Sequence, residues 1–134
     1  PHTIKSEFSL AVFEEPCELP RVDIIYAHIG EDAAMVSSSL ACGAEGIVFA
    51  GTGHGSIPAQ LEEVLFEAVR AGVVVVRASR IGAGPVLAGK AKWQKAGIIS
   101  CGMLNAQKAR ILLQLAIKKA GGDIKEIERI FKTY

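Results

Sequence analysis

A short apolar run that breaks abruptly into glycine-rich backbone limits the folds open to this chain. Residues 47–50 read IVFA, and the sequence GTGHGS follows at once from Gly51 to Ser56. The run has the length and content of a buried parallel strand. Beyond Pro58, apolar residues recur at spacings of three and four, which is typical of an amphipathic helix. The sequence therefore predicts a strand, a tight turn and a helix N-terminus, an arrangement at which ligands bind in open α/β sheets.

The glycine-rich turn has an equally good explanation that involves no ligand. Its glycines do not fit the pattern G-x-G-x-x-G, because Ser56 stands where the third glycine belongs, and no lysine follows as in a P-loop. The Ser56 hydroxyl could instead cap the following helix, with Pro58 in the first helical turn. A cradle of backbone amides for a phosphate or nucleotide is a third and weaker interpretation.

The composition indicates one folded domain without a strongly charged partner. The chain has 134 residues, 50% of them hydrophobic, and a formal net charge of +1, which excludes disorder and the electrostatic footprint of a nucleic-acid-binding domain. Lys90, Lys92 and Lys95 form one basic cluster beside Trp93, more typical of a solvated face. No apolar run reaches the roughly eighteen residues of a membrane span. Neither nucleic acid nor a membrane is therefore an expected partner.

The three cysteines indicate neither a metal site nor a disulfide framework. Cys17, Cys42 and Cys101 have no C-x-x-C spacing and no histidine placed near them as in zinc motifs. An odd count also argues against a complete set of disulfides. Cys42 lies in a helical pattern and Cys101 ends a predicted strand, so we expect both to be small buried hydrophobes and expect no metal site.

Strand and helix patterns alternate along the chain. Strands are predicted at residues 22–27, 47–50, 73–76 and 97–101. Helices are predicted from Glu31 or Asp32 to Ala41, from Pro58 to near Gly72, from Asn105 to Gly121 and from Asp123 onward. The all-valine run at 73–76 belongs in the middle of a parallel sheet. The predicted fold class is α/β, a three-layer sandwich in which a four-stranded parallel sheet carries helices on both faces.

Residues that typically begin or end helices stand at the expected positions. Gly43 and Gly121 stand where left-handed helix caps are expected, and Asn105 and Asp123 stand where N-caps are expected. Residues 1–20 carry three prolines and are predicted to be an extended lead-in, with Phe8, Leu10, Val12 and Phe13 alternating as a marginal strand. The folded domain is therefore expected to cover residues 21–134.

Polar residues follow three of the predicted strands. Arg77 to Arg80 reads RASR directly after the valine run, and such residues are candidates for a site or an interface, although pairing with surface carboxylates is the simpler explanation. His28 and His54 end the first two strands and could reach the same rim. Ser56 lies two residues from His54, but no orienting carboxylate is evident, so a self-contained hydrolase is disfavoured.

Four motifs in order resemble the C-terminal domain of bacterial L-asparaginases of the glutaminase-asparaginase type. They are GIVFAGTGHGS from Gly46, VVVVRASR from Val73, GMLNAQKARILLQLA from Gly102 and IERIFKTY from Ile127. The third motif has Ala106 where the family has proline. The resemblance covers essentially the whole chain, with residues 1–20 similar to the interdomain linker.

The resemblance implies an amidohydrolase that deamidates L-asparagine, and in some members L-glutamine, to the acid and ammonia through a threonine-linked acyl-enzyme, without a cofactor. The family's catalytic threonines lie in an N-terminal domain, so no catalytic residue is expected in this segment. Family active sites form between subunits of an intimate dimer, and two dimers make a homotetramer. By position, Ser56 is the residue that reaches the substrate of the neighbouring subunit. His54, where asparagine is common, is a weaker substrate-binding candidate.

One departure from the family keeps an alternative open. A family glutamate that helps to hold the substrate's α-amino group aligns near Lys90, and the loop from Ile81 to Ala96 contains no acid. A lysine there would repel an ammonium group. The alternative is therefore a non-catalytic module that binds a small amino acid or serves oligomerisation. The absence of an initiator methionine suggests a fragment, and the compartment is left open between periplasm and cytoplasm.

Overall fold

The structure, a computed structural model, describes residues 6–9, 13 and 17–134. In this part of the chain four strands form one parallel sheet in the order β1-β2-β3-β4. The strands are β1 (Val22–Tyr26), β2 (Gly46–Gly51), β3 (Val74–Ser79) and β4 (Ile99–Ser100). Each strand thus lies beside the one that precedes it in sequence, which confirms the predicted four-stranded parallel sheet.

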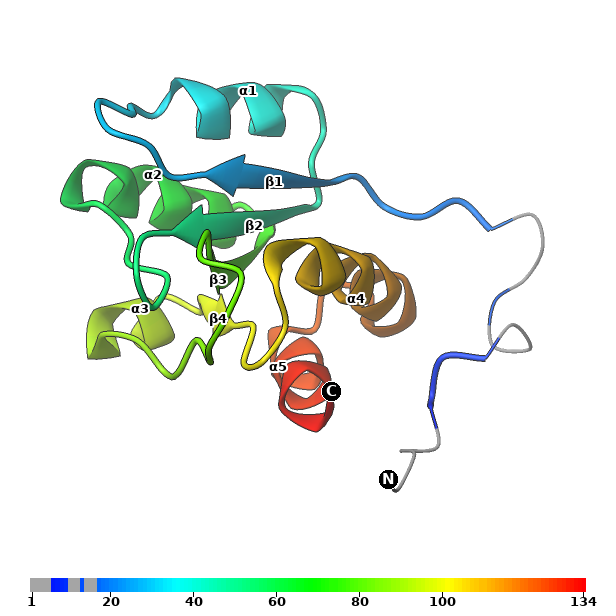
Figure 1. The fold of residues 1–134 in the computed structure, drawn as a ribbon. Coiled ribbons are helices and arrows are strands. Elements are labelled where there is room, and N and C mark those ends of the chain that lie inside the picture. The colour runs from blue at the N-terminus through cyan, green and yellow to red at the C-terminus, as the bar shows by residue number, and fades with distance from the viewer. Residues whose placement is uncertain (1–5, 10–12, 14–16) are drawn as a thin grey trace.

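The helices of the described residues cover both faces of this sheet (Figure 1). They are α1 (Ala34–Ala41), α2 (Ala59–Arg70), α3 (Ala91–Lys95), α4 (Ala106–Ala120) and α5 (Ile124–Thr133). Because the strands advance in one direction, crossovers of a single hand place α1, α2 and α3 on the same face. These helices pack on Ile47 and Phe49 of β2, whereas α4 and α5 pack on Val48 from the other side. The predicted three-layer α/β sandwich is confirmed.

The predicted helix caps are present. The Asn105 side chain accepts a hydrogen bond from the Lys108 amide (2.9 Å) at the start of α4, and Asp123 accepts from amides of the first turn of α5. Gly43 and Gly121 adopt positive φ angles of 80° and 60° just beyond α1 and α4, where a side chain would be strained. Local sequence therefore sets these helix ends.

Several boundaries differ from the sequence prediction. Helix α1 begins at Ala34, because the Asp32 carboxylate accepts from the Ala34 amide (2.8 Å) in a turn that precedes the helix. Strand β3 continues through Ser79, since it pairs with β2 as far as Gly51. Strand β4 is only two residues long, and α3 lies within residues 86–96, for which no helix or strand was predicted.

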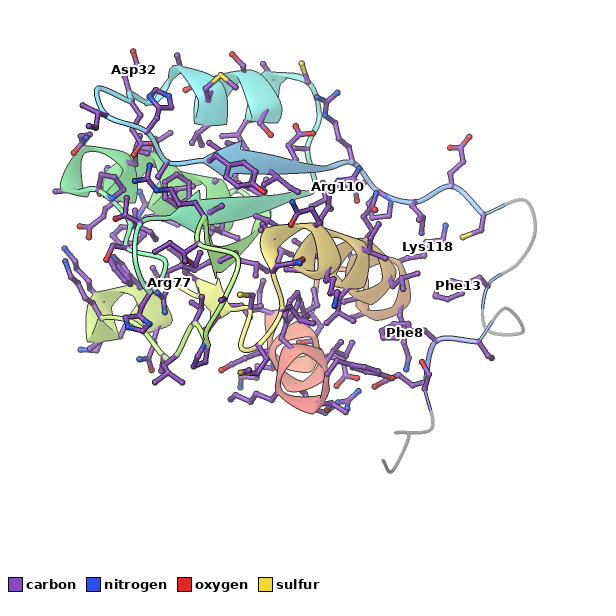
Figure 2. The ribbon with its side chains drawn as sticks, in the orientation of Figure 1. Phe8, Phe13, Asp32, Arg77, Arg110 and Lys118 are labelled. Atoms are coloured by element: carbon purple, nitrogen blue, oxygen red, sulfur yellow. The ribbon has the colours of Figure 1, made fainter. Side chains whose placement is uncertain are left out.

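The lead-in contacts the C-terminal helices. Phe8 packs against Tyr134 with ring centroids 5.6 Å apart, and the Glu7 amide donates to the Tyr134 hydroxyl (2.9 Å). Figure 2 shows Phe8 and Phe13 near each other, and their rings stack at 6.5 Å. Neither residue lies in a strand, so they do not form the predicted marginal strand, whose residues 10–12 are outside the described part.

The two cysteines that were predicted to be buried behave differently. Cys101 is buried, as expected, and burial raises the pKa of its thiol to about 11. Cys42 is exposed, so that prediction was wrong. It is the C-cap residue of α1, beyond the last turn that packs on the sheet.

Candidate functional site

The glycine-rich turn at the carboxyl end of β2 is closed by backbone contacts between its own residues. The Ser56 amide donates to the Thr52 carbonyl (2.8 Å), and the two residues form an isolated antiparallel bridge. Gly55 has a φ of 75°, and a Cβ there would lie 2.6 Å from the Ala78 carbonyl oxygen. Only glycine fits that position. The turn is thus packed against β3 before the chain reaches α2.

Ser56 does not cap α2, which excludes the alternative in which its hydroxyl caps that helix. The N-cap residue is Pro58, and no side-chain hydrogen bond caps the helix. The helix begins at Ala59, which leaves Ser56 two residues before the N-cap, too early to reach the amides of the first turn. The bridge to Thr52 also separates the glycine turn from the helix N-terminus, which weakens the anion-cradle interpretation. Ser56 is exposed at the rim of the sheet.

Arg77 lies directly beneath this turn and is buried, with 4% of its surface exposed. Its guanidinium donates to the backbone carbonyls of His54 (2.5 Å), Gly55 (3.1 Å) and Leu87. Burial lowers the pKa of Arg77 from its ordinary value, but an arginine stays protonated in a protein. The charge is therefore solvated by carbonyl dipoles rather than by the surface carboxylate that was predicted.

Arg80 and Ser79 hold the same rim together. Arg80 donates to the Ala27 carbonyl (3.0 Å) beyond β1, and the Ser79 hydroxyl donates to the Gly53 carbonyl. Among the residues that the structure describes, neither Arg77 nor Arg80 forms an ion pair. The polar side chains at the end of β3 thus bind backbone carbonyls rather than carboxylates.

Trp93 of α3 packs against Arg77, a contact that the sequence analysis missed. Its ring centroid lies 5.0 Å from the Arg77 guanidinium carbon, and the Lys90 ammonium lies 5.0 Å from the same centroid. The indole Nε1 donates to the Glu62 carboxylate (2.8 Å), which also pairs with Lys92. The hydrogen bond from Lys92, the largest effect, lowers the pKa of Glu62. The basic cluster is thus partly tied to the α2 face rather than simply solvated.

These residues surround an open pocket of about 340 Å³ at the carboxyl end of the sheet. It is lined by His54, Ser56, Arg77, Leu87, Ala88, Gly89, Lys90 and Trp93. The structure therefore brings both substrate-binding candidates, Ser56 and His54, together with Lys90. No carboxylate belongs to this lining. An electropositive, open wall of this kind can contact a small polar ligand but holds no nucleophile with an orienting base.

The two rim histidines do not meet. His54 Nδ1 lies 3.3 Å from the Pro85 carbonyl oxygen, and His28 Nδ1 lies 3.1 Å from the Ile29 carbonyl oxygen. No hydrogen bond joins His54 to Ser56 within the described residues, and no three potential ligands there gather as a metal centre.

No helix of this part of the chain is both long and apolar enough to cross a membrane.

The fold and the pocket define a class: a parallel α/β domain with an open pocket at the carboxyl edge of its sheet. Comparison with known proteins narrows that class. The family model of the glutaminase/asparaginase C-terminal domain matches residues 21–131. The chain belongs to this family.

Three related proteins extend over much more than this chain. It is 38% identical over 133 residues to L-asparaginase 2 of Bacillus subtilis, covering 99% of the chain and 34% of that protein. It is 37% identical over 134 residues to a probable periplasmic L-asparaginase of Haemophilus influenzae, again covering 99% of the chain and 37% of the relative. A crystal structure of a probable cytoplasmic L-asparaginase from Campylobacter jejuni superposes on this chain with a TM-score of 0.83 at 40% identity. The match covers 90% of this chain and 39% of the Campylobacter chain. The chain thus spans little more than a third of each.

Proposed function

We propose that this chain is the C-terminal domain of an amidohydrolase that converts L-asparagine or L-glutamine to the corresponding acid and ammonia. Family membership and the names of the relatives support this proposal. The observation that carries it is the shared pocket, in which exposed Ser56 and the loop at Lys90 face one open space. Ser56 is available there because it does not cap α2.

The division of labour is the one that the family resemblance implies. A nucleophilic threonine of an N-terminal domain attacks the amide carbon, ammonia leaves, and water hydrolyses the resulting ester. Ser56, with His54 in a lesser role, contacts the substrate bound at the neighbouring subunit of a homo-oligomer. Residues 1–20 link the two domains. On this proposal the chain is inactive alone, and the protein works in the periplasm or the cytoplasm, the two compartments named for its relatives.

A serine substitution in the full-length protein tests the proposal. Ser56→Ala removes one hydrogen bond to the substrate and should lower kcat/KM for ammonia release about tenfold, the effect of one such bond. Ser37→Ala, at an exposed serine of α1, is the matched control and should leave the rate unchanged. Equal rates for Ser56→Ala and the wild type would reject the role of Ser56.

The lining of the pocket favours a second candidate, a non-catalytic module that binds a small amino acid or serves oligomerisation. Lys90 stands at the pocket and no carboxylate lines it, so the wall lacks the acidic partner that would hold the α-ammonium of asparagine for catalysis. Calorimetry with L-asparagine separates the two functions. Binding without release of ammonia by the full-length protein would favour the module.

A further inference from the structure

We propose that Arg77 is a positioning residue that sets the separation of the two walls of the pocket. The turn wall comprises Gly51–Ser56, and the loop wall comprises residues 87–90. This role rests on the proposed function, because it matters to catalysis only if Ser56 contacts an amide substrate. Arg77 itself does not touch the substrate in this proposal and acts through the backbone that carries Ser56.

The two terminal nitrogens of the guanidinium reach different walls. Nη1 donates to the carbonyls of His54 (2.5 Å) and Gly55 (3.1 Å) in the turn wall. Nη2 donates to the carbonyl of Leu87 in the loop wall. The guanidinium is planar, and its donors form a rigid fork. Its geometry therefore fixes the distance between two segments that are more than thirty residues apart in sequence.

Each wall carries a glycine pressed against this side chain. A Cβ on Gly55 would lie 3.2 Å from Arg77 Cγ, and a Cβ on Gly89 would lie 2.8 Å from Arg77 Nη2. The second contact is too short for real side chains, and the same Cβ would also meet the Trp93 ring. Both walls thus approach the Arg77 side chain so closely that a Cβ at either glycine would crowd it.

The guanidinium is also held on its remaining face. Trp93 stacks at 5.0 Å, and its indole is anchored to Glu62 (2.8 Å). Among the described residues Arg77 has no carboxylate partner that could pull the guanidinium away from the carbonyls. A buried charge whose hydrogen bonds all go to main-chain carbonyls orders that main chain, because leaving any of them unmade is costly. Ser56 directly follows one of the two ordered carbonyls of the turn wall.

Replacement of the fork by a point donor in the full-length protein tests this role. Arg77→Lys keeps the charge, but one ammonium does not span both walls. Amide hydrogen exchange should accelerate in both walls together, and kcat/KM for amide hydrolysis should fall on the order of 100-fold, as for a displacement of about 1 Å. Adding Ser56→Ala to Arg77→Lys should lower kcat/KM by a smaller factor than Ser56→Ala does in the wild type, because a displaced Ser56 no longer contacts the substrate well.

Arg110→Lys is the matched control. Arg110 also donates to a backbone carbonyl, that of Val22 (2.7 Å), but it lies away from the pocket (Figure 2). This variant should leave exchange in both walls and kcat/KM unchanged. Should Arg77→Lys fail to fold, Gly89→Ala replaces it, since the added methyl would clash with both the Trp93 ring and the Arg77 guanidinium at the loop wall.

The outcomes separate the two proposals. Acceleration in only one wall, or in neither, overturns the positioning role, as does a full additional loss from Ser56→Ala. A wild-type protein that releases no ammonia would reject the proposed function. In that case, amide hydrogen exchange would still test the positioning role of Arg77. Faster exchange in both walls of Arg77→Lys supports the role, and unchanged exchange rejects it.

Discussion

The indole nitrogen of Trp93 donates to the carboxylate of Glu62 across 2.8 Å, joining α3 to α2 beneath the pocket. Both residues are buried, Trp93 at 4% and Glu62 at 8% exposure. Glu62→Ala leaves the indole donor and the Lys92 ammonium without their acceptor. We expect the free energy of unfolding to fall by about 2 kcal/mol, measured by urea denaturation of the full-length protein.

Two further variants serve as controls for that prediction. Glu62→Gln keeps an acceptor for Trp93 and should be less destabilising than Glu62→Ala. Glu63→Gln changes the adjacent carboxylate, which pairs with Arg70 on the exposed face of α2, and should shift the free energy by less than about 0.5 kcal/mol. An equal loss for Glu62→Ala and Glu63→Gln would show that the anchor to Trp93 contributes nothing.

The glycine turn offers a second prediction. Gly55→Ala places a methyl 2.6 Å from the Ala78 carbonyl oxygen at a φ of 75°, so overpacking adds about 1–3 kcal/mol to the strain of the backbone. Gly53→Ala has a φ of 52° and no neighbour within 4 Å, so it carries the backbone strain alone, about 1 kcal/mol. Thermal unfolding and ammonia release of the two variants compare these effects. Equal stability would mean that the turn is not packed on β3.

The ion pairs of the lead-in predict a pH dependence. The Glu7 carboxylate forms ion pairs with Lys119 and with Arg129, the second at 2.8 Å. Hydrogen bonds from these two side chains lower the pKa of Glu7, and the bond from Lys119 has the larger effect. A carboxyl with a depressed folded pKa stabilises the fold above its unfolded pKa, and this contribution is lost as pH falls through the folded pKa. The Tm difference between wild type and Glu7→Gln should therefore be largest near neutral pH and vanish in acid.

Thermal scans between pH 3 and 8 check this prediction. Glu128→Gln is the control, because Glu128 pairs with Lys132 on the exposed surface of α5. A difference between wild type and Glu7→Gln that stays constant across this range would contradict the account of the lead-in.

Thiol reactivity gives a fourth prediction. Burial raises the pKa of Cys101 to about 11, so at pH 8 its thiol is protonated and enclosed, whereas Cys42 is exposed. Maleimide should label Cys42 in the native protein and Cys101 only after denaturation, as mass spectrometry of peptides would show. Native labelling of Cys101 at the rate of Cys42 would contradict its burial.

The fold was predictable where the signal is local. The valine run at 73–76, the glycines at 43 and 121 and the caps Asn105 and Asp123 each fix a strand or a helix end through their own backbone preferences. Cys42 was mispredicted because a helical pattern does not reveal which face lacks a partner. Strand β3 was predicted too short because its extension depends on pairing with β2.

The site was predictable only in part. The positions of Ser56 and His54 at the end of a buried strand follow from the sequence pattern, and the structure places both at one pocket. The alternative that Ser56 caps α2 is excluded because the helix begins three residues later, at Ala59. The partners of Arg77 and the bond between Glu62 and Trp93 join residues 10 to 31 positions apart. No spacing in the sequence reports such contacts, although a single tryptophan among lysines was a signal that α3 packs against something.

The most direct measurement of the central claim compares ammonia release from L-asparagine by the full-length protein and by residues 1–134 alone. The account predicts turnover by the full-length protein and none by the isolated chain, because the pocket wall described above contains no nucleophile with an orienting base. Turnover by residues 1–134 alone would contradict it, and so would a full-length protein that releases no ammonia.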